Sequence, residues 1–164
     1  MMTRDQFWTV IDSARRLDPD EPAEGLRKVL GRLKLAEIAG FQAHFDELFD
    51  AACRWDLWGA AYLMGGGCSD DGFIDFRYGL ISHGRRVYEA ALADPDSLAG
   101  LDDHVEDEAY GSIAAEVHED KGGGALPPAT GAVTEPAGEQ WDFDDPDENR
   151  KRLPRLSEEY GAGC

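Results

Sequence analysis

Apolar residues recur every three or four positions over most of the first 120 residues, which is the spacing of one face of an α-helix. The first predicted helix begins after Thr3, because Thr3 and Gln6 form the pattern of a capping box, and it ends before Pro19. Further apolar stripes span residues 26–33, 38–52, 73–81, 87–92 and 105–117. The alternation typical of β-strands does not occur in the sequence, so the pattern predicts an all-α helical bundle.

The stripe of residues 38–52 continues through Trp55 and Tyr62 without an obvious interruption. This pattern fits either one long helix or two helices that break near Arg54. Between Trp55 and Met64 the apolar residues lie on every side, which is typical of a helix in the middle of a bundle. The three glycines of residues 65–67 then end this helix.

The chain has 164 residues, enough for one domain with a sizeable core. We expect the helical bundle domain to cover residues 3–120. Residues 121–140 are rich in glycine and proline and read as a flexible linker. Residues 141–164 form a charged C-terminal segment, in which Trp141, Phe143 and Leu153 are side chains of the kind that dock onto a bundle.

The composition is strongly acidic, with 34 Asp and Glu against 16 Lys and Arg and a formal net charge of −18. This balance argues against binding to nucleic acid or to an anionic membrane. The charge is uneven, because ten carboxylates and no Lys or Arg lie between Asp94 and Asp120. Such a run is typical of a solvated face, and it also fits a docking surface for a basic protein or loose cation binding.

The cysteines, Cys53, Cys68 and Cys164, are odd in number and widely spaced, which argues against a disulfide framework. The N-terminal residues lack the apolar stretch of a signal peptide, and no apolar run is long enough to span a bilayer. We therefore expect a cytoplasmic protein with free thiols.

The densest group of chemically capable side chains lies between Trp55 and Arg77. Ser69 is placed to cap a helix whose positive end favours the acidic residues that follow it. One interpretation is a helix junction, in which glycines let two helices turn and pack closely. A second is a binding pocket with an aromatic wall and a polar rim, and a third is a divalent cation on the carboxylates. The residues of this candidate site are Trp55, Asp56, Trp58, Tyr62, Cys68, Ser69, Asp70, Asp71, Asp75 and Arg77.

Arg77 lies on the apolar stripe of its helix, so we expect it to be buried and to need a carboxylate partner. The partners within reach of the predicted helices are Asp56, Asp70, Asp71 and Asp75.

Several chemistries are disfavoured by the same stretch. The glycine turn lacks the Lys and Ser/Thr of a P-loop, and its carboxylates would repel phosphate. A dinucleotide fingerprint is missing, and the histidines show no zinc-ligand spacing. Cys68 has no histidine base nearby in the sequence, so we predict no catalytic residue, no metal and no cofactor.

The segment W-D-L-W…G-G-C-S-D-D-x-F-x-x-F-R, residues 55–77, resembles the signature of a bacterial family of domains of unknown function. The likeness begins at Phe7-Trp8 and extends to about Tyr110. The resemblance implies a mostly helical single domain with no established reaction, and it supplies no catalytic residue.

Two classes of function follow. The first is a non-catalytic interaction or regulatory module whose acidic half docks a basic protein. In that case the joint neutralisation of Asp102, Asp103, Glu106 and Asp107 abolishes binding and leaves the fold intact. The second class is a small-molecule binder or enzyme that uses the candidate site at the glycine turn.

Overall fold

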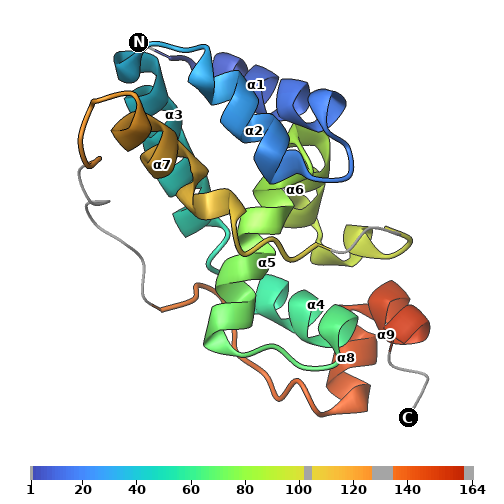
Figure 1. Ribbon diagram of the computed structural model, residues 1–164. Coiled ribbons are helices and arrows are strands. Elements are labelled where there is room, and N and C mark those ends of the chain that lie inside the picture. Colours follow the sequence, from blue (N-terminus) through green and yellow to red (C-terminus); the bar gives the residue numbers. More distant parts are fainter. Residues whose placement is uncertain (1, 102–104, 127–134, 161–164) are drawn as a thin grey trace.

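The computed structural model describes residues 2–101, 105–126 and 135–160, and these residues form an all-α fold, as the apolar pattern predicts (Figure 1). Within the described ranges, the only strand-like pairing is an isolated bridge between Arg54 and Ala137. The α-helices are α1 (Arg4–Leu17), α2 (Pro22–Gly31), α3 (Leu35–Ala51), α4 (Trp55–Gly65), α5 (Asp70–Ser82), α6 (Arg85–Ala93), α7 (Ile113–Asp120), α8 (Pro146–Arg152) and α9 (Pro154–Tyr160). Two short 3₁₀ helices are η1 (Pro95–Leu98) and η2 (Tyr110–Ser112).

The predicted start of α1 is confirmed by the complete capping box of Thr3 and Gln6. Of the two alternatives for residues 38–62, the structure has two helices: α3 ends at Ala51, and Arg54 is the extended residue that precedes α4. The break lets α4 leave the direction of α3 and lie beside α5 (Figure 1). Helix α4 ends at Gly65, followed by Gly66 in the left-handed region at φ 68°.

Helix α5 runs through the middle of the molecule (Figure 1). Its residues Phe73, Phe76, Leu80 and Ile81 are buried in a core that α1, α3 and α7 share. Gly79 is required in this position because a Cβ built there would lie 1.3 Å from the carbonyl oxygen of Val105. The missing side chain allows the backbone of residues 105–108 to lie directly on α5, where the Asp107 amide donates to the Asp75 carbonyl oxygen at 3.0 Å.

The predicted helix over residues 105–117 is therefore wrong in its first half. Val105 is buried against α5 outside any helix, Tyr110 begins η2, and the α-helix starts only at Ile113. The reason is the backbone hydrogen bond from Asp107 to Asp75, which holds this segment against α5 and takes the amide that a helix would use.

The C-terminal helices α8 and α9 pack beside α4, at the end of the molecule away from α1 and α2 (Figure 1). Trp141 contacts α4 at Gly59, where an added Cβ would lie 2.5 Å from the indole ring. Leu153 and Leu156 are fully buried, at 1% and 0% exposure. Residues 127–134 of the predicted linker and Cys164 lie outside the described residues.

A buried carboxylate from η1 fixes the start of α9. Asp96 is 4% exposed, and its two oxygens accept the backbone amides of Arg155 at 3.0 Å and Leu156 at 2.9 Å. The helix is thus capped by a residue that lies far away in the sequence, instead of by its own preceding residue. No helix among the described residues is long and apolar enough to cross a membrane.

The close approach at Gly79 gives a direct test of the core. We expect Gly79→Ala to lower the free energy of unfolding by about 3 kcal/mol, because the new methyl group overlaps the Val105 carbonyl and must displace it. Urea denaturation measures the loss. Gly31→Ala is the control, since nothing lies within 4 Å of its added Cβ, and it should be neutral or slightly stabilising. Equal effects of the two substitutions would contradict the close approach.

Candidate functional site

The aromatic side chains of the predicted site form a continuous stack. The rings of Trp55 and Trp58 are 5.4 Å apart, and Trp58 stacks on Phe73 of α5 at 4.7 Å. The Trp58 indole Nε1 donates to the Cys68 carbonyl oxygen at 2.9 Å, which ties the glycine turn to α4. These contacts join α4, the turn and α5, as the helix-junction interpretation requires.

Arg77 is buried as predicted, at 6% exposure, but the predicted carboxylate partner is wrong. Its Nη1 donates to the Phe49 carbonyl oxygen at 3.1 Å, and its guanidinium lies over the rings of Phe49 and Phe73. Within the described residues, no ion pair joins Arg77 to Asp56, Asp70, Asp71 or Asp75. Burial lowers the pKa of Arg77, and the nearby Cys53 and Asp50 partly oppose that shift. Its guanidinium packs on aromatic faces in place of the four expected carboxylates.

Asp56 is paired with Arg54 and, in the part of the chain that the structure describes, makes no ion pair with Arg77. It accepts hydrogen bonds from Arg54, with 3.0 Å between Arg54 Nε and the Asp56 Oδ1 atom. Arg54 Nη1 also donates to the Leu92 carbonyl oxygen at 2.8 Å. The sequence analysis groups Asp56 with the glycine turn. In the structure, Asp56 lies in the first turn of α4 and the glycine turn follows the opposite end of that helix, so the two are far apart.

Ser69 caps helix α5, and the surroundings of Cys68 keep its thiol protonated. The Ser69 hydroxyl accepts the Gly72 amide at 3.2 Å, so the predicted N-cap of α5 is confirmed. Burial raises the pKa of the Cys68 thiol to about 11, and the negative charges of Glu106, Asp70 and Asp75 add to the shift. A thiol with this pKa is almost entirely protonated near pH 7 and is a poor nucleophile.

The N-terminal half of α5 and the segment after Val105 bring together a group of carboxylates, which we call the acidic cluster. The position of this cluster follows from the hydrogen bond between the Asp107 amide and the Asp75 carbonyl, which holds residues 105–108 along α5. Burial and the charges of Glu108, Glu106, Asp71 and Asp107 all raise the pKa of Asp75. No group of His, Cys, Asp and Glu among the described residues is arranged to hold a metal ion. The acidic cluster consists of Asp70, Asp71, Asp75, Glu106, Asp107 and Glu108.

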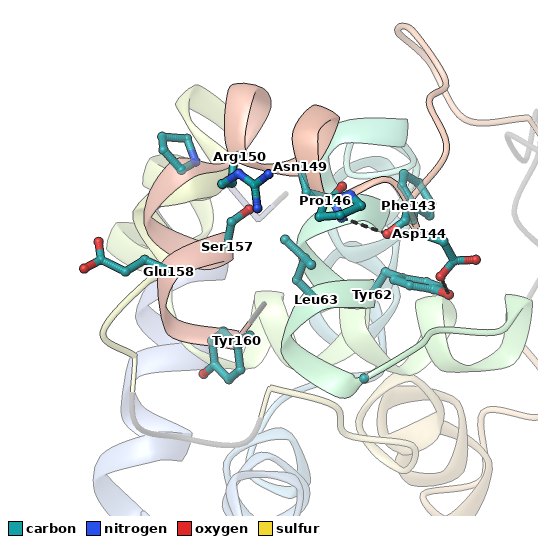
Figure 2. A pocket seen from close by; sticks show the side chains of 12 residues that line it. Tyr62, Leu63, Phe143, Asp144, Pro146, Asn149, Arg150, Ser157, Glu158 and Tyr160 are labelled. Carbon is teal, nitrogen blue, oxygen red and sulfur yellow. Dashed lines mark hydrogen bonds between the residues drawn. The ribbon is translucent and has the colours of Figure 1, made fainter. Parts of the chain in front are cut away.

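A groove of about 1000 Å³ lies on another side of α4, between α4 and the pair α8–α9 (Figure 2). Tyr62 is the one predicted site residue in its lining, and it donates a hydrogen bond to Asp144. The sequence missed the groove because most of its lining lies beyond residue 140, although Trp141, Phe143 and Leu153 already indicated docking. Its lining includes Tyr62, Leu63, Phe143, Asp144, Pro146 and Ser157.

Asn149 holds the wall of the groove in place. It is 5% exposed, its Oδ1 accepts the Trp141 indole N–H at 2.8 Å, and its Nδ2 donates to the Phe143 carbonyl oxygen at 2.8 Å. Both functions of the amide are used, so Asn149 positions the aromatic segment and has little capacity left for a ligand.

The comparison with protein families gives a match. A family model described as a protein of unknown function, DUF4240, matches residues 2–120. The chain belongs to the DUF4240 family. It matches no curated protein and no solved structure. The matched region of this DUF4240 protein includes α1 to α7, whereas α8 and α9 lie beyond it.

The aromatic environment of Arg77 leads to a prediction for this DUF4240 protein. Arg77→Ala should lower the free energy of unfolding by about 3 kcal/mol, because it removes the guanidinium from two rings and leaves the Phe49 carbonyl unpaired. Arg77→Met should cost clearly less, since its side chain fills much of the same space between the two rings. Chemical denaturation compares the two variants. A methionine variant as unstable as the alanine variant would indicate that a stranded carboxylate had paired with Arg77.

The raised pKa of Cys68 leads to a second prediction. Alkylation by iodoacetamide at pH 8 should be about a hundredfold slower than for a thiol with the usual pKa of 9.0, and its rate should rise until about pH 11. Glu106→Gln should speed the reaction, because it removes a charge that disfavours the thiolate. Mass spectrometry of the labelled peptide reports the rate at this cysteine alone. Glu116→Gln on α7 is the charge-matched control, and a rate plateau near pH 9 would contradict the prediction.

Proposed function

We propose that this protein is a non-catalytic interaction module that docks a basic protein partner through the acidic cluster. The observation that carries the proposal is the missing side chain of Gly79, which lets residues 105–108 lie on α5 and gathers their carboxylates beside Asp75. Gathering like charges costs free energy, and after burial the charges of the neighbouring carboxylates raise the pKa of Asp75. A basic partner would relieve that cost, so the arrangement supports a surface used for binding.

The distribution of basic side chains supports the same proposal. Among the described residues, the ion pairs of Arg4, Arg27, Arg85, Arg152 and Arg155 are made with carboxylates outside the acidic cluster. The cluster therefore keeps its negative potential, which would speed association with a positive surface and help to select it. The sequence predicts a docking surface that includes Asp102, Asp103, Glu106 and Asp107. Residues 102–104 lie outside the described residues, so only Glu106 and Asp107 of this set have a described position.

A small-molecule site at the glycine turn has less support. The indoles of Trp55 and Trp58 are occupied by stacking, Arg77 is occupied by Phe49 and Phe73, and the Cys68 thiol is held protonated. We also propose a bacterial origin and a cytoplasmic location, the latter supported by the free thiols of Cys53 and Cys68.

Binding of a fluorescent oligolysine peptide, followed by anisotropy at low salt, tests the docking surface. We expect the combined variant Asp71→Asn, Asp75→Asn, Glu106→Gln and Glu108→Gln to weaken binding at least about tenfold and to flatten its salt dependence. The same variant should melt at a higher temperature than the natural sequence, because the repulsion within the cluster is removed.

The control variant neutralises the exposed residues Asp20, Glu21, Glu119 and Asp120, which changes the net charge equally at a distance from the cluster. It should retain most of the binding. If both variants weaken binding of the peptide equally, binding follows net charge alone and the acidic cluster is only a solvated face.

A further inference from the structure

The groove between α4 and the pair α8–α9 contains a buried polar group, the hydroxyl of Ser157. Ser157 is 6% exposed and lines the groove, and its hydroxyl has no hydrogen-bond partner among the residues that the structure describes. Buried hydroxyl groups in folded proteins are almost always paired, because an unpaired one has lost its bonds to water without replacement. A ligand that places a polar atom here would satisfy the Ser157 hydroxyl, which can both donate and accept.

The opposite part of the groove favours a positive charge. Figure 2 shows Asp144 and Tyr62 together beside Phe143, with Leu63 between them and Ser157. The Tyr62 and Phe143 rings are 5.4 Å apart, and the Tyr62 hydroxyl donates to Asp144. No ion pair joins Asp144 to a basic side chain of the described residues. A carboxylate beside two aromatic faces suits an ammonium group, which can form an ion pair and a cation–π contact together.

The other charged residues of the lining do not reverse this preference. Arg150 forms an ion pair with Asp147, which offsets its charge, and Glu158 points away from the other lining residues (Figure 2). Between the two polar ends, Leu63 and Pro146 provide an apolar surface. The volume of about 1000 Å³ is at the upper end of the range for sites that hold small organic molecules.

We propose that this groove binds a small organic amine with an apolar body and a polar group at its far end. The ammonium lies at Asp144 and Tyr62, the body lies along Leu63 and Pro146, and the polar group meets Ser157. The net charge of −18 attracts such a cation to the protein. One wall comes from α4 and the other from residues beyond the family match, so the site is separate from the acidic cluster and does not depend on the proposed function.

Tyramine and its longer-chain homologues are the probes, because each carries an ammonium, an aromatic body and a terminal hydroxyl. Phenethylamine lacks the hydroxyl, and 4-ethylphenol lacks the ammonium. Isothermal titration with the full chain should give saturable binding of at least one hydroxylated amine. The NMR signals of the Leu63 methyl groups, which lie inside the groove, should shift on binding.

Two substitutions assign the ends of the ligand. Ser157→Ala should weaken the best hydroxylated amine about tenfold and leave phenethylamine unchanged, because only the former loses a hydrogen bond. Asp144→Asn should weaken both amines about tenfold or more and leave 4-ethylphenol unchanged. Glu119→Gln, the same change of charge on α7, should have no effect, and circular dichroism confirms that each variant is folded.

The proposal is overturned if no homologue binds saturably or if binding leaves the Leu63 signals unshifted. It is also overturned if Ser157→Ala affects the hydroxylated and plain amines alike, or if Asp144→Asn and Glu119→Gln weaken binding equally. The last result would mean that the amines follow the overall charge of the protein.

Discussion

Helix α4 is apolar around most of its circumference and therefore needs cover from more than one side. Trp58 stacks on Phe73 and covers it toward α5, and Trp141 lies against Gly59 on another face. The first cover comes from the region that defines the family, and the second comes from the chain beyond residue 120. This one requirement explains why the C-terminal helices belong to the same packed structure, and why a groove forms where their fit to α4 is incomplete.

Two glycines bring together segments that lie far apart in the chain. At Gly59 the missing side chain admits an indole, and at Gly79 it admits the backbone of Val105. The first contact anchors the segment that brings Phe143 to the groove, and the second gathers the carboxylates of the acidic cluster. Both candidate sites thus depend on close backbone approaches at positions where any side chain would force the segments apart. The aromatic and charged side chains that give each site its chemistry are secondary to these approaches.

The sequence was sufficient for the parts of the fold that depend on local patterns. The capping box at Thr3, the cap at Ser69 and the end of α4 at its glycines all follow from neighbouring residues, and each is present. The burial of Arg77 was also predictable, because its position on an apolar helical stripe does not depend on the rest of the fold.

The predictions that failed concern features that depend on contacts between residues far apart in the sequence. The partner of Arg77 is a carbonyl and two aromatic rings, one of them on α3, and no spacing within the predicted helices indicates that choice. Residues 105–109 have an apolar residue in helical register, but a backbone hydrogen bond from Asp107 to Asp75 of α5 holds them outside any helix. The groove could not be located because it needs the placement of α8 and α9 against α4.

The cap that Asp96 provides for α9 makes this helix conditional on a distant part of the chain. A helix of seven residues has little stability alone, and its first turn here is completed by a carboxylate from η1. Opening of η1 therefore uncaps α9, and loss of α9 leaves the buried Asp96 without its amide partners. The two segments form one cooperative unit, so their amides should share a common free energy of opening in hydrogen exchange. The wall that carries Ser157 is then present only while both ends of this unit are in place.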